Sequence, residues 1–112
     1  MTDSQLTYED ERTAICDYGR SLLEDDLTTG TGGNLSVRLE ADRIAISPSG
    51  VPYEDVNPKD VPVVDTDGTV LAGELDPSTE LPMHLAVYAE RPGVGGVVHT
   101  HSPYATTFAS LG

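Results

Sequence analysis

Hydrophobic and polar residues follow two different periods along this chain, and each period predicts its own kind of element. Between residues 6 and 26, hydrophobic side chains recur at spacings of three and four with acidic residues between them, which predicts an amphipathic helix. Its hydrophobic side is formed by Ala14, Ile15, Tyr18, Leu22 and Leu23. Cys16 falls on this side as well, so we expect a buried, structural thiol there.

Strict alternation takes over after residues 28–33, where this helix ends. Residues 35–39 and 43–47 alternate hydrophobic and polar positions on either side of a short acidic turn, and this pattern predicts an antiparallel hairpin. Residues 48–52 contain two prolines and a glycine and predict a rigid turn after the hairpin.

A second hairpin is predicted where residues 61–64 and 69–72 flank the turn sequence Asp65-Thr66-Asp67-Gly68. Proline cannot donate a hydrogen bond within a sheet. Pro62 therefore indicates that the first of these strands lies at an edge or enters the sheet at that residue.

The last third of the chain predicts a helix, a strand and a second helix. Ser78 can cap a helix over residues 79–90, in which Pro82 falls early enough to be tolerated. A strand follows over residues 95–101, and Ser102-Pro103 then predicts the start of a helix that reaches residue 112. The hydrophobic side of the first of these helices consists of Leu81, Leu85 and Tyr88. Together these elements indicate one α/β domain with a largely antiparallel sheet flanked by helices.

The charge of the chain excludes some partners. Its 112 residues carry 19 acidic and 6 basic side chains, and the net charge of −13 opposes nucleic acid and anionic membranes. No signal peptide and no hydrophobic run of about 20 residues is present, so we expect a cytoplasmic protein. Lys59 is the only lysine, while Asp and Thr are abundant, a pattern typical of halophilic proteins from salt-loaded cytoplasm.

Three segments carry groups suited to binding a phosphate. Gly30-Thr31-Gly32-Gly33-Asn34 matches neither the dinucleotide fingerprint nor the Walker pattern, but its N–H groups and the Asn34 amide can hold a small anion. Ser49-Gly50 in a turn and Ser78-Thr79 at a helix N-terminus offer similar donors. Taken one at a time, each segment is better explained as an ordinary turn or cap.

Two histidines and a glutamate indicate a metal site. His99 and His101 are two residues apart on a predicted strand, so both imidazoles would face the same side of the sheet. A carboxylate within reach of such a metal can serve as a general base and later as an acid, and Glu80 is placed for this role; an exposed glutamate in a first helical turn explains the residue equally well. His84, one turn later, is either a further ligand or, as we favour, a surface or half-buried histidine.

The order and spacing of these motifs closely resemble the class II aldolase/adducin family. The resemblance rests on residues 30–38, 46–50, 77–80 and 98–101 and extends from the first helix to residue 112. It implies a class II aldolase-like fold, with a central, mainly antiparallel sheet between helices, assembled as a homotetramer. It also implies that residues 1–112 form the N-terminal part of a single domain about twice as long.

The resemblance further assigns roles to individual residues. Gly33, Asn34, Ser49, Gly50, Ser78 and Thr79 fall where the family holds the substrate phosphate. Glu80 falls on the catalytic acid/base and a metal ligand, and His99 and His101 fall on two of three zinc-binding histidines. The implied reaction is a Zn²⁺-dependent aldol cleavage of a phosphorylated ketose, such as fuculose 1-phosphate, to dihydroxyacetone phosphate and an aldehyde through an enediolate. One Zn²⁺ per subunit is implied, or another divalent metal.

Other activities remain open at this point. The family's third histidine and a C-terminal tyrosine fall in a half that this chain lacks. Pentulose-phosphate 4-epimerases and thiosugar-phosphate dehydratases of the family share most of these motifs. A non-catalytic, truncated remnant that serves as an interaction module is the alternative outside enzyme chemistry.

Overall fold

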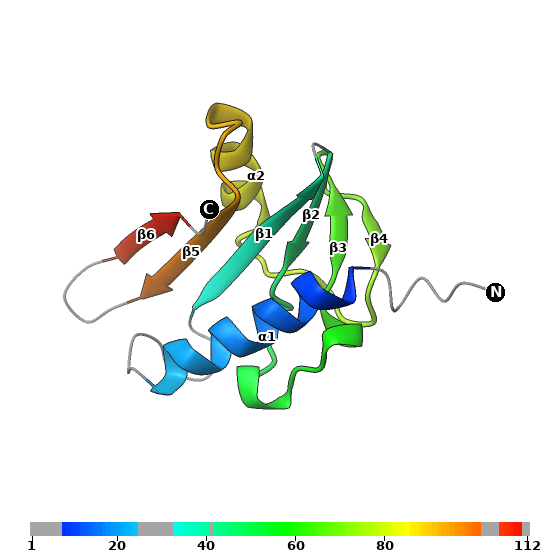
Figure 1. Ribbon diagram of the computed structural model, residues 1–112, viewed down its shortest axis with the longest axis vertical. Coiled ribbons are helices and arrows are strands. Elements are labelled where there is room, and N and C mark those ends of the chain that lie inside the picture. The colour runs from blue at the N-terminus through cyan, green and yellow to red at the C-terminus, as the bar shows by residue number, and fades with distance from the viewer. Residues whose placement is uncertain (1–7, 25–32, 41, 102–105, 111–112) are drawn as a thin grey trace.

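The computed structural model describes residues 8–24, 33–40, 42–101 and 106–110. The elements in chain order are α1 (Glu9–Glu24), β1 (Asn34–Glu40), β2 (Arg43–Ile46), the 3₁₀ helices η2 (Tyr53–Asp55) and η3 (Pro58–Asp60), β3 (Val63–Asp65), β4 (Val70–Ala72), α2 (Leu81–Glu90), β5 (Gly96–His101) and β6 (Thr106–Ser110). The strands form one sheet in the order β4-β3-β2-β1-β5-β6, and every neighbouring pair is antiparallel. The predicted fold class, an antiparallel sheet flanked by helices, is confirmed (Figure 1).

Helix α1 confirms the predicted first helix, but not every residue assigned to its hydrophobic side. Ile15 and Cys16 are buried, and burial raises the pKa of the Cys16 thiol, as expected for a structural cysteine. Tyr18, in contrast, is 50% exposed. The buried side of α1 follows Arg12, Ile15 and Gly19, and Tyr18 lies to one side of that stripe, about 100° around the helix from Gly19. The side chains of Leu22 and Leu23 lie outside the described part of the chain.

Both predicted hairpins are present. Strand β1 pairs with β2, with Val37 opposite Ala45, and β3 pairs with β4, with Val64 opposite Val70. Strand β3 also pairs with β2, so it is internal to the sheet, and Pro62 stands just before it. The predicted alternative in which the strand enters the sheet at the proline is therefore correct.

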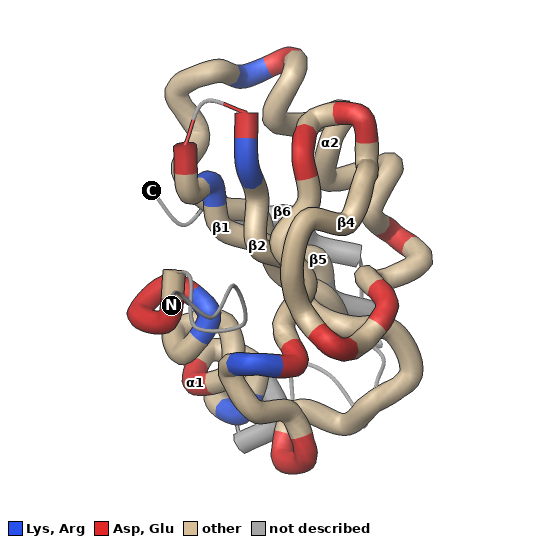
Figure 2. The backbone as a smooth tube through the Cα atoms, turned by 90° about the vertical axis from the view of Figure 1, so that its right-hand side faces the viewer, with Lys and Arg blue, Asp and Glu red and all other residues tan. Residues whose placement is uncertain are grey.

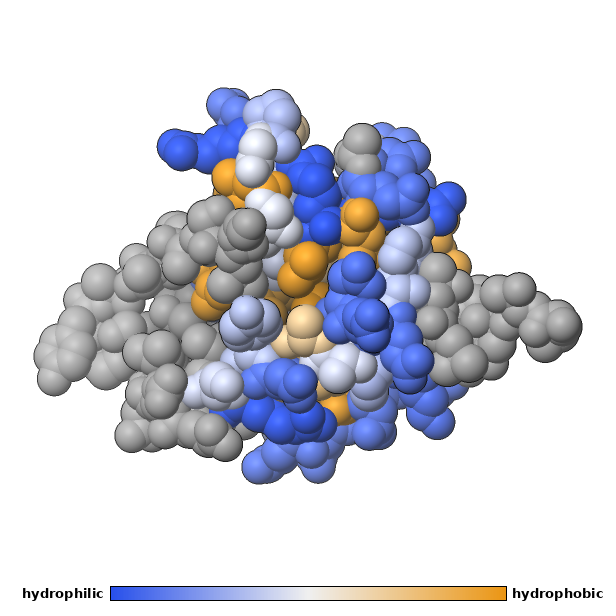
Figure 3. Space-filling model, in the orientation of Figure 1, coloured by the Kyte–Doolittle hydropathy of each residue, from blue (hydrophilic) through white to orange (hydrophobic). Residues whose placement is uncertain are grey.

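The sheet separates two hydrophobic clusters, as the alternation of its strands requires. On the α1 side, Leu35 and Ala45 pack with Ile15. On the α2 side, Ile44 and Val97 pack with Tyr88. In the space-filling view, hydrophobic residues show over the middle of the molecule and hydrophilic residues border them (Figure 3). The odd and even positions of β1 thus serve different helices, which decides which of its side chains can face α2.

Two predictions at the ends of helices are wrong. Helix α2 begins at Leu81, with Glu80 rather than Ser78 as its N-cap, and the Ser78 hydroxyl instead accepts the Glu80 N–H at 3.1 Å. The predicted helix after Ser102-Pro103 is replaced in its described part by β6, which pairs with β5. A strand beside β5 satisfies backbone groups of that strand, and β-branched Thr106 and Thr107 favour it.

Acidic residues lie mainly in the helices, in the loops and at the ends of strands, as the red segments of the backbone in Figure 2 show. None of the helices that the structure describes is long and hydrophobic enough to cross a membrane. Repulsion among so many acidic groups opposes folding and is weakened by salt.

Candidate functional site

Ser47 joins the three segments that the sequence singled out. Its hydroxyl accepts the Leu35 N–H at 3.1 Å, and its own N–H donates to the Leu35 carbonyl at 2.8 Å. Its carbonyl accepts the Ser78 N–H at 2.9 Å. Because Ser47 is buried and bonds in both directions, it ties the start of β1 to the segment that precedes α2.

Two further contacts close the same cluster. The Ser49 N–H donates to the Asp76 carbonyl at 2.9 Å, next to a bridge between Pro48 and Pro77. The Tyr53 hydroxyl donates to the Gly33 carbonyl at 2.9 Å, and burial raises the pKa of Tyr53 to about 12. The structure therefore brings the three predicted phosphate segments together, although they are far apart in the sequence.

The predicted phosphate-binding residues differ in how exposed they are. Gly33, Asn34 and Ser78 are buried, Ser49 is half-buried, and Gly50 and Thr79 are exposed. Gly50 has a φ of 73°, which a residue with a side chain rarely adopts, and a Cβ there would meet open space. This position therefore requires glycine for its backbone conformation and not for close packing. Gly30, Thr31 and Gly32 lie outside the described residues.

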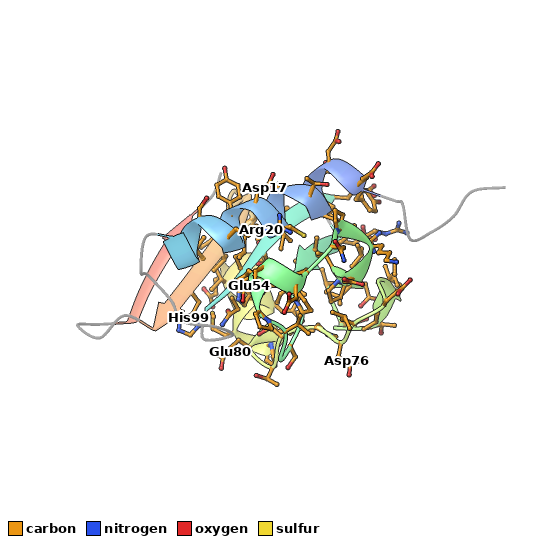
Figure 4. The ribbon with its side chains drawn as sticks, turned by 90° about the horizontal axis from the view of Figure 1, so that it is seen from below. Asp17, Arg20, Glu54, Asp76, Glu80 and His99 are labelled. Atoms are coloured by element: carbon orange, nitrogen blue, oxygen red, sulfur yellow. The ribbon has the colours of Figure 1, made fainter. Side chains whose placement is uncertain are left out.

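Glu80 stands at the N-terminus of α2, half-buried. Its carbonyl accepts the N–H groups of Met83 at 3.0 Å and His84 at 3.2 Å, which anchors its backbone to the first turn. The helix dipole favours a carboxylate at this end. Figure 4 shows Glu80 and His99 toward the same end of the molecule.

His99 lies in β5 directly opposite Asn34 in β1, and it is 6% exposed. Paired residues of neighbouring strands share a face of the sheet, so His99 faces α2 as Asn34 does. His101 follows two residues later in β5, but its side chain lies outside the described part of the chain. Among the described residues, no group of three His, Cys, Asp or Glu side chains is placed to hold a metal ion.

His84 is not the surface or half-buried histidine that we expected, because it is fully buried. Its Nε2 lies 2.5 Å from Asn34 Oδ1 and its Nδ1 lies 2.6 Å from Ser36 Oγ. Ser36 Oγ in turn lies 2.8 Å from the Tyr88 hydroxyl. Since both ring nitrogens are occupied by protein atoms, His84 is not a further metal ligand in this arrangement.

These four residues form what we call the buried polar chain: Tyr88, Ser36, His84 and Asn34. Burial, and secondarily the charge of nearby His99, lowers the pKa of His84 from 6.5 to about 4, so its imidazole is neutral at pH 7. The hydrophobic pattern does not predict the buried polar chain, yet the spacing of its residues in the sequence is a signal for it. Asn34 and Ser36 are two residues apart on a strand, and His84 and Tyr88 are four apart on a helix, so each pair presents polar groups to one side.

Arg38 fixes the far end of the buried polar chain. Its guanidinium lies 4.8 Å from the centre of the Tyr88 ring, and its Nη2 donates to the Tyr88 carbonyl at 3.1 Å. Its Nε donates to the Val94 carbonyl at 3.1 Å. Tyr88 is thus held on both its ring and its backbone, and burial raises its pKa to about 12.

Comparison with known proteins gives consistent matches. A family model described as Class II Aldolase and Adducin N-terminal domain matches residues 13–112. The 5-deoxy-D-ribulose 1-phosphate aldolase of Bacillus thuringiensis serovar kurstaki is 49% identical over 108 residues, which are 96% of this chain and 51% of that protein. The L-ribulose-5-phosphate 4-epimerase of Salmonella paratyphi B is 43% identical over 99 residues, 88% of this chain and 43% of that protein.

Solved structures agree with these relatives. An L-fuculose 1-phosphate aldolase superposes with a TM-score of 0.82 and 40% sequence identity, covering 91% of this chain and 49% of that one. The resemblance to this kind of aldolase, and the expectation of a partial length, are confirmed. The chain spans about half the length of the curated relatives it matches.

Proposed function

The chain belongs to the class II aldolase and adducin family, and from this premise we propose that the protein catalyses a reversible, divalent-metal-dependent aldol cleavage of a phosphorylated ketose. The products would be dihydroxyacetone phosphate and an aldehyde. The observation that carries the proposal is the cluster around Ser47, which gathers three donor segments beside Glu80. Ketose 1-phosphates such as 5-deoxyribulose 1-phosphate and fuculose 1-phosphate are the substrates we propose to test first, since relatives are named for them.

The substrate phosphate is proposed to bind among six residues of this cluster. These are Gly33, Asn34, Ser49, Gly50, Ser78 and Thr79. Backbone N–H groups, hydroxyls and one amide supply its donors, and the N-terminal end of α2 adds a favourable dipole. Such a site needs no basic patch, which suits a chain with a net charge of −13.

The metal is proposed to bind to His99, His101 and Glu80. An imidazole and a carboxylate fit Zn²⁺ and related divalent ions, and His99 faces the same side of the sheet as α2, where Glu80 stands. When bound, the ion polarises the substrate carbonyl and hydroxyl and so acidifies the neighbouring C–H group. Purified protein is expected to contain zinc or another divalent metal, and His99→Ala is expected to lose most of it. Equal metal content in both proteins would remove this part of the proposal.

Glu80 is proposed to take and return the proton of that C–H group. Its backbone carbonyl is anchored to the first turn of α2 by the N–H groups of Met83 and His84, which fixes the point from which the carboxylate extends. Glu80→Gln keeps the size of the side chain and removes the base. We expect it to lower exchange of the dihydroxyacetone phosphate C–H into deuterated water by at least about 100-fold. Unchanged exchange would refute this role.

A second candidate function is pentulose-phosphate 4-epimerisation, which the 43% identical epimerase favours. A dehydratase and a non-catalytic interaction module are the remaining alternatives. Product analysis separates them: release of dihydroxyacetone phosphate supports the aldolase, an inverted C4 centre supports the epimerase, and loss of water supports the dehydratase. Metal binding without any turnover of these substrates would support the interaction module.

The assembly and cellular setting are also proposals. We propose a homotetramer for the full-length protein, to be tested by sedimentation equilibrium. We propose a cytoplasmic location in a salt-loaded cell from the excess of acidic over basic residues. A location of this kind would place the phosphorylated sugars of metabolism within reach of the enzyme.

A further inference from the structure

The buried polar chain has a direction that can be derived from its ends. Asn34 Oδ1 can only accept a hydrogen bond, so His84 Nε2 must carry the proton and donate it. A neutral imidazole then has Nδ1 free of a proton, and this nitrogen accepts from the Ser36 hydroxyl. Ser36 Oγ accepts in turn from the Tyr88 hydroxyl. Every donor therefore points from Tyr88 toward Asn34.

This direction determines which end of the Asn34 amide meets the predicted phosphate site. An asparagine side chain has an oxygen that accepts and an NH₂ group that donates, and the two point in opposite directions. The oxygen is committed to His84, so the NH₂ group is the end that remains for a ligand. A phosphate accepts hydrogen bonds, so only this orientation of the amide is productive.

From this arrangement we propose that His84 is a positioning residue, which holds the Asn34 amide with its NH₂ group toward the substrate phosphate. Ser36 and Tyr88 fix the tautomer and the ring orientation of His84, and Arg38 holds Tyr88 from behind. The proposal rests on the proposed function, because it assumes that a phosphate binds beside Asn34. It adds to that function a specificity device: a rigid donor selects a phosphorylated ligand over its unphosphorylated analogue.

The surroundings of the buried polar chain keep its side chains rigid. Ser36 and His84 are fully buried. Two of the four side chains come from β1 and two come from α2, which covers that face of the sheet. A hydrogen-bond chain in such surroundings keeps its members in single orientations, because a flipped amide would leave its own NH₂ group against His84. We expect the amide to be oriented before the ligand arrives.

Three variants of the whole protein test the proposal by calorimetric binding of dihydroxyacetone phosphate and of dihydroxyacetone. His84→Leu removes the donor, and we expect the dissociation constant for the phosphate to rise about tenfold, with little change for dihydroxyacetone. His84→Gln keeps an N–H toward Asn34 and an oxygen toward Ser36, so it should stay within about threefold of the original protein. Tyr88→Phe removes only the outermost donor and should change binding by less than about twofold.

Nitrogen NMR supplies a readout that a general loss of stability would not give. We expect His84 to carry its proton on Nε2, and we expect the side-chain NH₂ signal of Asn34 to shift when dihydroxyacetone phosphate is added. In His84→Leu this shift should be lost while the backbone amides of Ser49 and Thr79 still respond. If His84→Leu does not fold, His84→Gln and the original protein still decide the outcome.

Distinct results overturn the proposal and the proposed function. A proton on Nδ1, full affinity in His84→Leu, or an affinity of His84→Gln ten times lower than that of the original protein would each overturn the positioning role. If the original protein bound dihydroxyacetone phosphate no better than dihydroxyacetone, the phosphate site itself would fail. A proton on Nε2 of His84 would then show that the buried polar chain orients the Asn34 amide for a structural reason alone.

Discussion

Acidification is expected to destabilise the protein through His84. The pKa of this residue is about 4 in the folded protein and 6.5 in the unfolded chain, chiefly because burial disfavours its charged form. Above pH 6.5 the residue is neutral in both states, so its contribution to stability is fully present. As the pH falls from 6.5 toward 4, the unfolded chain binds a proton that the folded protein does not, and stability is lost.

The size of this loss follows from the two pKa values. One pKa unit corresponds to about 1.4 kcal/mol, so the complete loss is about 3 kcal/mol, and about 2 kcal/mol of it falls between pH 7 and pH 5. The assay is urea denaturation at both pH values for the original protein and for His84→Gln, which cannot titrate. Subtracting the loss in the variant removes the contribution of the carboxylates. The same loss in both proteins would refute the assignment of a buried, neutral His84.

Three further perturbations test the packing and the charge of the fold. Raising KCl from near zero to molar levels should raise the melting temperature, because salt screens the net charge of −13, and a flat or falling trend would contradict the halophilic interpretation. Alanine favours helices, yet Gly19→Ala should destabilise the protein by about 1 kcal/mol or more in urea denaturation, because the added Cβ would overlap the Tyr53 ring. An unchanged denaturation midpoint would contradict this packing. Arg12→Met should lower the free energy of unfolding by about 3 kcal/mol in the same assay, since the buried guanidinium donates to the Val61 and Lys59 carbonyls. A loss below about 1 kcal/mol would show that water can donate to these carbonyls in place of the guanidinium.

The period of the hydrophobic pattern was enough to predict most of the fold. The hairpins of β1 with β2 and of β3 with β4 were predictable because alternation and turn residues are local signals. The element after Ser102 was not, because a cap followed by proline signals a helix locally, whereas pairing with the edge of β5 is a contact in space. Tyr18 was misplaced for a similar reason, since the stripe that packs on the sheet includes the buried Arg12, which a hydrophobic pattern cannot find.

The candidate site was predictable as a set of residues but not as a geometry. The motifs named Asn34, Ser49 and Ser78 separately, and only Ser47 and its hydrogen bonds show how they meet. The sequence predicts a surface or half-buried His84, because a single histidine in a helix has no partner that a local pattern can reveal. Its partners lie 48 and 50 residues away, at Ser36 and Asn34, so only the folded chain reveals them.

The measurement that tests the central claim most directly is release of dihydroxyacetone phosphate from a ketose 1-phosphate, followed with the full-length protein before and after removal of its metal. The account predicts steady release by the metal-loaded protein, recovery when Zn²⁺ is added back, and loss of at least about 100-fold in Glu80→Gln. Undiminished release by Glu80→Gln, or by protein whose metal has been fully removed, would contradict it.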